Sequence, residues 1–195
     1  MHGLMMRSVQ CFICDTYGQD TWLEVVAAAG LGFDNFEALM RYDEKLCDQL
    51  IEAAVARLEK PREELFEDLG TYLASHPNME NLRRLLRFGG ETFVEFLYSL
   101  DELPDRSRLA VPDLDLPALD LRDHSPTNLT LAIAASYPGI GHVMAGVLRA
   151  MADDYGTLAL LEHVGRSGDA ELITIQLMDV DFSDGRAFDL ALGVG

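Results

Sequence analysis

Apolar residues recur at helical spacing through the first half of the chain. Phe93, Phe96, Leu97 and Leu100 fall at i, i+3, i+4 and i+7, which places them on one face of a helix. Pro104 lacks an amide hydrogen and disfavours helix in the residue before it, so we expect this helix to end there. Similar spacing predicts earlier helices over residues 4–14, 20–29, 45–58, 61–73 and 78–86.

Beyond Pro104 the pattern changes to alternation of apolar and polar residues, which predicts strands. We expect strands over 109–121, 129–135, 158–164 and 171–180, with a helix over 143–155 and a loose end over 185–195. The loop 165–168 predicts that the last two strands form a hairpin. The chain is therefore predicted to be an α+β protein, with a helical N-terminal lobe packed on a lobe with a mostly antiparallel sheet.

Charge and composition narrow the classes of partner. The net charge of −18 argues against nucleic acid and anionic membrane surfaces as partners, because both are polyanions. No apolar run reaches the ~18 residues of a membrane span, and the N-terminus does not resemble a signal peptide. Three cysteines, an odd number, fit a reducing compartment. We therefore expect a cytoplasmic protein.

The candidate chemistry is sparse. Cys11 and Cys14 lie three residues apart and would share a helix face, which suits a redox pair or, with further ligands, a metal; buried structural cysteines are the alternative. Neither a nucleophile elbow nor a complete dinucleotide-binding fingerprint is present. The sequence thus predicts a protein that is not an enzyme.

The central helix carries a recognisable motif. Between Gly90 and Leu103 the chain reads Gly-x-x-hydrophobic-x-x-Phe-Leu-x-x-Leu-Asp-x-Leu. This run resembles the proximal helix of the heme–nitric-oxide/oxygen-binding (H-NOX) family, the sensor domain of soluble guanylate cyclase and of bacterial relatives. The opening Met-His-Gly-Leu, Trp22 and the segment 39–44 resemble the same family in the same order. The resemblance implies one H-NOX domain over 1–195, with a distal helical lobe over 1–60 and a proximal α+β lobe over 61–195.

The family's heme-binding residues are replaced in this chain. In the family, the residue after Leu-Asp-x-Leu is the histidine that ligates heme iron; here it is Pro104. The family's Tyr-x-Ser-x-Arg motif, which holds the heme propionates, falls on Ile133, Ala135 and Tyr137. The resemblance implies heme as cofactor, whereas these replacements predict that normal heme binding is lost.

The resemblance also places a heme-type pocket. A vacated pocket would favour a flat or aliphatic molecule, or would have collapsed around Tyr137. A non-standard axial ligand is the alternative, from His142 at the start of the pocket wall, His76 or His2. The positions expected at the pocket are Met5, Phe93, Leu97, Leu100, Leu103, Pro104, Ile133, Ala135, Tyr137, His142 and Leu148.

These observations predict a sensory domain that regulates a partner by protein contact. By analogy with bacterial members of the family, the partner would be a histidine kinase or a cyclic-di-GMP enzyme. Two alternatives remain: a thiol redox or metal sensor that uses Cys11 and Cys14, and a heme or gas sensor with a non-standard axial ligand.

Overall fold

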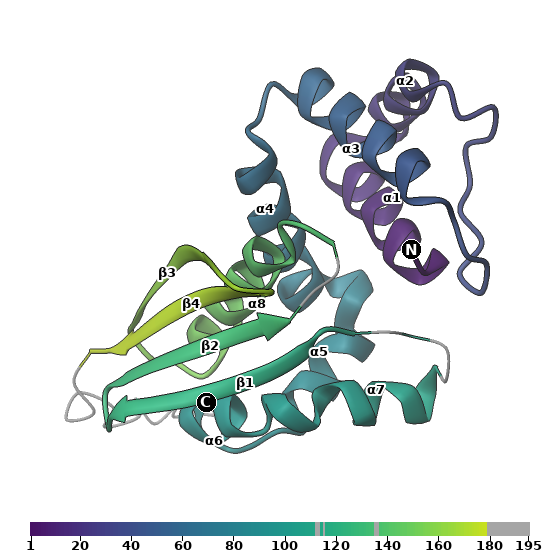
Figure 1. Cartoon of the computed structure of the whole chain (residues 1–195). Coiled ribbons are helices and arrows are strands. Elements are labelled where there is room, and N and C mark those ends of the chain that lie inside the picture. Colours follow the sequence, from purple (N-terminus) through teal and green to yellow (C-terminus); the bar gives the residue numbers. More distant parts are fainter. Residues whose placement is uncertain (112–113, 115, 135–136, 179–195) are drawn as a thin grey trace, which may run out of the picture.

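The computed structural model describes residues 1–111, 114, 116–134 and 137–178. Its first half is helical and its second half carries the sheet (Figure 1), as predicted. The helices are α1 (Gly3–Tyr17), α2 (Gln19–Ala29), α3 (Glu44–Leu58), α4 (Arg62–Ser75), α5 (Glu80–Arg87), α6 (Phe93–Tyr98), α7 (Leu103–Ala110) and α8 (Ile140–Asp154), with 3₁₀ turns η1 (Pro77–Met79) and η2 (Leu100–Glu102).

The segment predicted as one central helix is built differently. Thr92 and Glu95 form a capping box that starts α6, but the chain tightens into η2 after Tyr98. Pro104 then lies in the first turn of α7. The prediction that Pro104 ends a helix is wrong, because proline is tolerated in a first turn, where its missing amide hydrogen would have no helical acceptor.

Within the described residues the sheet has four strands, β1 (Ala118–Ser125), β2 (Asn128–Ala134), β3 (Ala159–Ser167) and β4 (Ala170–Leu177), in the order β1-β2-β4-β3. All three pairings are antiparallel, and β3 and β4 form the predicted hairpin. The first predicted strand, 109–121, is only partly correct: Leu109 belongs to α7 and β1 begins directly after Pro117. A proline fits that position because it leaves the ladder hydrogen bonds intact.

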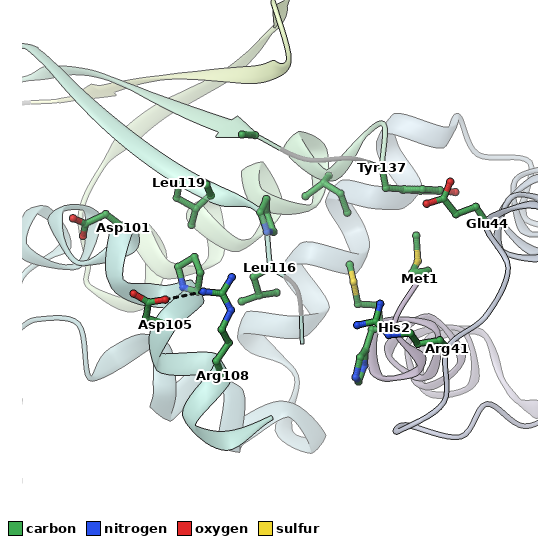
Figure 2. Close-up of a pocket in the computed structure, with 16 residues that line it drawn as sticks. Met1, His2, Arg41, Glu44, Asp101, Asp105, Arg108, Leu116, Leu119 and Tyr137 are labelled. Carbon is green, nitrogen blue, oxygen red and sulfur yellow. Dashed lines mark hydrogen bonds and ion pairs between the residues drawn. The ribbon is translucent and has the colours of Figure 1, made fainter. Parts of the chain in front are cut away.

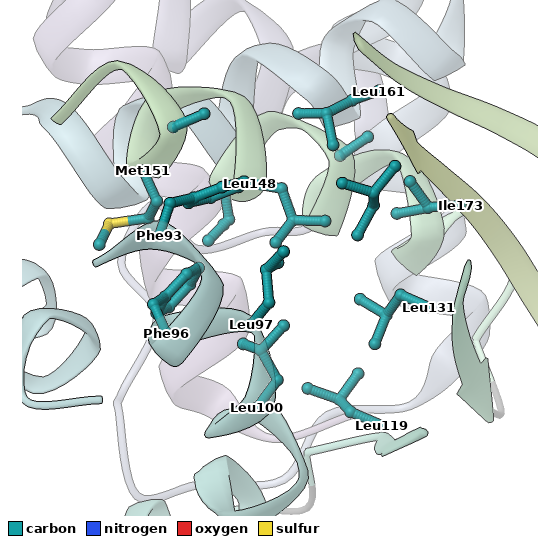
Figure 3. Packing of buried hydrophobic residues seen from close by; sticks show 14 of the residues in the cluster. Phe93, Phe96, Leu97, Leu100, Leu119, Leu131, Leu148, Met151, Leu161 and Ile173 are labelled. Atoms are coloured by element: carbon teal, nitrogen blue, oxygen red, sulfur yellow. The ribbon is translucent and has the colours of Figure 1, made fainter. Parts of the chain in front are cut away.

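One face of the sheet packs against α6 and α8. Figure 3 shows this sheet-side core, in which every labelled side chain is buried. Phe93, Leu97 and Leu100 supply the helical side, and Leu131 and Ile173 supply the strands. The predicted apolar face of the central segment is thus the face that the sheet covers.

A second cluster, the helix-side core, is shared by α1–α4. Trp22 and Phe36 are fully buried in it, and the Trp22 indole N–H donates to the carbonyl oxygen of Asp34 at 2.8 Å. Most buried side chains of α4, including Phe66 and Leu69, join this cluster although α4 lies beyond residue 60. The lobe boundary at residue 60 stays a prediction.

The helices α4 and α8 approach each other closely at two glycines and run side by side below the α1–α3 group (Figure 1). A Cβ atom on Gly70 would lie 1.9 Å from the carbonyl oxygen of Val143, and one on Gly146 would lie 2.0 Å from that of Glu67. Only glycine permits this backbone contact. Among the described residues, every helix is too short or too polar to span a bilayer.

Candidate functional site

An apolar cavity of about 300 Å³ lies where the two cores meet. We call it the inner cavity. Helices α1, α4, α5 and α8 and the segment before β1 contribute most of its walls, with smaller contributions from α3 and α7. Its lining residues are Met1, Leu4, Met5, Met6, Ser8, Val9, Cys47, Ile51, Phe66, Leu69, Leu73, Leu82, Leu85, Leu86, Leu103, Ser107, Val111, Leu114, Leu116, Pro117, Leu119, Tyr137, Ile140, Val143, Met144 and Val147.

A polar cleft of about 590 Å³ adjoins the inner cavity and shares lining residues with it, among them Met5 and Tyr137. We call this cleft the mouth. Figure 2 shows Asp105 and Arg108 on one wall, and His2 and Arg41 on the other. Glu44 and Asp101 add two further carboxylates. The mouth therefore carries charges of both signs above an apolar interior.

The structure brings together only some of the predicted site residues. Met5, Leu103 and Tyr137 line the inner cavity, and Pro104 lines the mouth. Other predicted positions lie in the sheet-side core and do not line either space: Phe93, Leu97, Leu100, Ile133 and Leu148. Ala135 lies outside the described residues. That the full set of predicted positions forms a heme-type pocket stays a prediction.

Tyr137 is buried beside the inner cavity and points toward the distal helices. Its hydroxyl donates to the Asp48 carboxylate at 2.7 Å and accepts from the Arg62 guanidinium at 2.8 Å. The Arg62 guanidinium also lies 5.3 Å from the centre of the Phe66 ring. Burial, followed by the hydrogen bond to Asp48, raises the pKa of the Tyr137 phenol. This residue thus links the turn before α8 to α3 and α4.

Pro104 is buried in the wall of the mouth. Its carbonyl oxygen accepts the hydroxyl of Ser107 at 2.7 Å. Its ring nitrogen is a main-chain amide, which has no lone pair for a metal.

His142 lies away from the cavity, against His163. The centres of the two rings are 4.0 Å apart, and the His142 ring faces Glu67 at 3.7 Å. His163 contacts the buried carboxylate of Glu171 at 3.1 Å. The predicted position of His142 at the start of α8 is correct, but its ring joins this cluster and lines neither the inner cavity nor the mouth.

His2 is the histidine that lines the mouth. Its Nδ1 accepts the amide hydrogen of Leu4 at 3.1 Å and so caps α1. Because Nδ1 must be unprotonated for this bond, the proton of the neutral ring lies on Nε2, where a metal would otherwise bind. His76 caps η1 in the same way, and it lines neither space.

The cysteines do not form a cluster with other metal ligands. Burial raises the pKa of the Cys11 and Cys14 thiols and raises that of Cys47 to about 11. Among the residues that the structure describes, no group of three or more His, Cys, Asp or Glu side chains could hold a metal ion. Because the pKa of each thiol is raised, these cysteines carry little thiolate near neutral pH.

Sequence reasoning missed one buried acid. The Glu171 carboxylate accepts the amide hydrogens of Gly139 at 2.7 Å and Gly141 at 2.8 Å, which fixes the start of α8. The alternation of residues along β4 could have revealed it, because Glu171 lies on the same strand face as the buried Ile173 and Ile175. A carboxylate on a buried face needs a hydrogen-bond partner.

Comparison with known proteins gives one family. Residues 2–163 match the family model described as Haem-NO-binding. The chain is 31% identical over 149 residues to soluble guanylate cyclase gcy-31 of Caenorhabditis elegans, covering 76% of this chain and 21% of that protein. It is 21% identical over 164 residues to soluble guanylate cyclase 89Da of Drosophila melanogaster, covering 84% of this chain and 25% of that protein. The chain thus spans a quarter or less of these relatives.

Solved structures share the fold. The unliganded Fe(II) H-NOX protein from K. algicida superposes with a TM-score of 0.76 at 17% identity, covering 92% of this chain and 97% of that chain. The H-NOX protein from S. oneidensis in the Fe(II)NO state gives 0.75 at 14% identity, covering 92% and 100%. The α+β H-NOX fold predicted from the sequence is confirmed, and the chain belongs to the Haem-NO-binding (H-NOX) family.

Proposed function

We propose that this chain is a sensory domain that has lost normal, stoichiometric heme binding and that regulates a signalling partner by protein contact. The curated relatives are guanylate cyclases by name, so a cyclase within the same protein or complex is a candidate partner. A histidine kinase or a cyclic-di-GMP enzyme is the candidate suggested by bacterial members of the family. The domain itself would be regulatory rather than catalytic, with a cytoplasmic location.

The observation that carries the proposal is Pro104 in the wall of the mouth. It stands where the family has its iron ligand, and its amide nitrogen cannot ligate a metal. The imidazole and the thiol that line the two spaces do not replace it. His2 uses Nδ1 as a helix cap, and burial keeps Cys47 in the thiol form. The residues present therefore do not fit a His-ligated heme.

The propionate positions support the same proposal. Ile133 is fully buried among apolar side chains, so it offers no group to a carboxylate. Tyr137 stands at the position of the family's arginine, and its hydroxyl is already bonded to Asp48 and Arg62. A porphyrin placed here would leave its carboxylates without the fixed guanidinium that normally pairs with them.

The thiol-sensor alternative receives no support from the thiol chemistry. Burial is the largest cause of the raised pKa of both Cys11 and Cys14, and a low pKa is what makes a thiol reactive. A thiol titration with and without oxidant tests this alternative. Formation of a disulfide or retention of zinc would revive it.

The first experiment is an absorption titration of the purified chain with hemin, after expression with excess heme precursor. We expect broad, non-saturating adsorption. A sharp Soret band at one heme per chain, shifting with nitric oxide, would overturn the proposal and direct attention to a non-standard axial ligand.

Two variants separate the missing ligand from the missing propionate anchors. We expect Pro104→His alone to restore little heme binding, because Ile133 and Tyr137 still fail to hold the propionates. Pro61→His is the matched control, since Pro61 lies exposed before α4 and away from both spaces. Stoichiometric heme in Pro104→His alone would show that the anchors matter less than we propose.

A further inference from the structure

The inner cavity offers hydrophobic surface and almost no hydrogen-bonding capacity. The hydroxyl of Ser8 donates to the carbonyl oxygen of Leu4 at 3.0 Å, and that of Ser107 donates to Pro104 at 2.7 Å. Tyr137 is satisfied by Asp48 and Arg62. The polar side chains in the wall are already hydrogen-bonded to protein groups. A water molecule would therefore form few hydrogen bonds inside the cavity, and an apolar ligand would break few by entering.

The walls suit an occupant without rigid shape. Met1, Met5, Met6 and Met144 line the cavity. Methionine has an unbranched, adaptable side chain, which lets a surface follow flexible apolar ligands. The volume of about 300 Å³ lies at the lower end of the range for small-molecule sites.

The mouth adds a polar environment at one end of this apolar space. Met5, Leu119 and Tyr137 line both spaces, so the cavity and the cleft adjoin at these residues. Arg41 and Arg108 are opposed there by Glu44, Asp101 and Asp105 (Figure 2). A setting with both signs of charge favours an uncharged polar head over an anionic one.

We propose that the inner cavity binds a single hydrocarbon chain whose uncharged polar head lies in the mouth. This inference rests on the proposed function, because a His-ligated heme would compete for the same region. The driving force is burial of methylene groups against the apolar walls, so affinity depends on chain length. The ligand class is a simple aliphatic amphiphile.

The test is a chain-length series of n-alkanols, from butanol to dodecanol, measured by isothermal titration with the wild-type chain. We expect affinity to rise about fourfold per added methylene and then to level off when the cavity is full. Decanoate serves as the charged comparison and should bind no more tightly than decanol. Binding of the carboxylate without any length dependence among the alkanols would overturn the proposal.

Two substitutions in the cavity wall should change the length dependence in opposite directions. Val143→Phe fills space, so it should weaken decanol binding by about tenfold or more. Leu73→Ala adds space, so its affinity should level off at a longer chain than in the wild type. If Val143→Phe fails to fold, the Leu73→Ala result still decides the question.

Leu160→Ala is the matched control for Leu73→Ala. Leu160 lies on β3, is 54% exposed and does not line the cavity. An identical shift in Leu73→Ala and Leu160→Ala would overturn the assignment of binding to the cavity. If neither hemin nor any alkanol binds, this inference fails while the proposed function stands. A stoichiometric heme complex would instead defeat the proposed function.

Discussion

The centre of the sheet-side core and the boundary between the two cores differ in what they leave open. The sheet-side core packs α6 and α8 on the strands, with Leu97, Leu100 and Leu148 completely buried and lining neither the inner cavity nor the mouth. At the boundary, Leu86 and Val147 of the sheet-side core and Phe66 and Leu69 of the helix-side core line the inner cavity. The apolar residues of the family motif on the central segment therefore serve mainly in packing, whereas Tyr137, at a replaced position, lines the cavity between the cores.

The largest expected effect tests this difference in packing directly. Leu97→Ala should reduce the free energy of unfolding by about 3–5 kcal/mol, because its neighbours cannot collapse into the space left behind. Leu73→Ala, half-buried at the cavity, should cost roughly 1–2 kcal/mol. Urea unfolding measures both. Equal losses of unfolding free energy in the two variants would mean that the side chains around Leu97 and those around Leu73 are packed equally densely.

A smaller effect is expected from the buried acid of the sheet-side core. Glu171→Leu should lower the free energy of unfolding by about 2–3 kcal/mol, because the amide hydrogens of Gly139 and Gly141 lose their acceptor. Glu162→Leu on the neighbouring strand is the control, since Glu162 is exposed. A Glu171→Leu variant as stable as this control would show that the carboxylate does not hold the start of α8.

The link from the turn before α8 to α3 and α4 is expected to be weaker still. Tyr137→Phe removes the hydrogen bonds to Asp48 and Arg62 and should cost about 1–2 kcal/mol in thermal or urea unfolding. Tyr98→Phe also removes a hydrogen bond to an aspartate, Asp123, but at an exposed site. It should change stability by less than about 0.5 kcal/mol. Similar losses in both variants would argue against Tyr137 as a connection.

The smallest effect concerns pH and the helix-side core. The hydrogen bond from Tyr72 lowers the pKa of Asp15, with a further contribution from Asn78. A lowered folded-state pKa gives stability that is present above about pH 4 and is lost as the pH falls through the folded-state value. Unfolding curves of wild type and Asp15→Asn should therefore converge at acidic pH. Tyr72→Phe should reduce the same pH dependence, and an unchanged profile in both variants would contradict the assignment.

Much of the fold followed from local pattern, because helix and strand periods are set by the backbone. The four helices before Pro77 and the final hairpin were predicted in this way. The start of α7 was missed because proline suits both the position after a helix and the first turn of one. The turn that decides between them is η2, whose i→i+3 geometry has no distinct apolar period.

The candidate site was predicted less completely. Pro104, Met5 and Tyr137 were placed by family motif, and they do line the mouth or the cavity. The contribution of α5 to the cavity and the pairing of Tyr137 with Asp48 could not be predicted, because both depend on contacts between distant segments. Local spacing says which face of a helix is apolar, but not which neighbour leaves part of that face uncovered.

The glycine contacts between α4 and α8 have a mechanical consequence. Because the two backbones touch at Gly70 and Gly146, the helices cannot slide past each other or separate without losing dense packing. They therefore behave as one rigid unit. Both helices form walls of the inner cavity. Any expansion or contraction of that space must then displace its other walls, chiefly α1, α5 and the segment before β1. Under the proposed sensory role, a ligand that changes the volume of the cavity would therefore move these walls relative to α4 and α8.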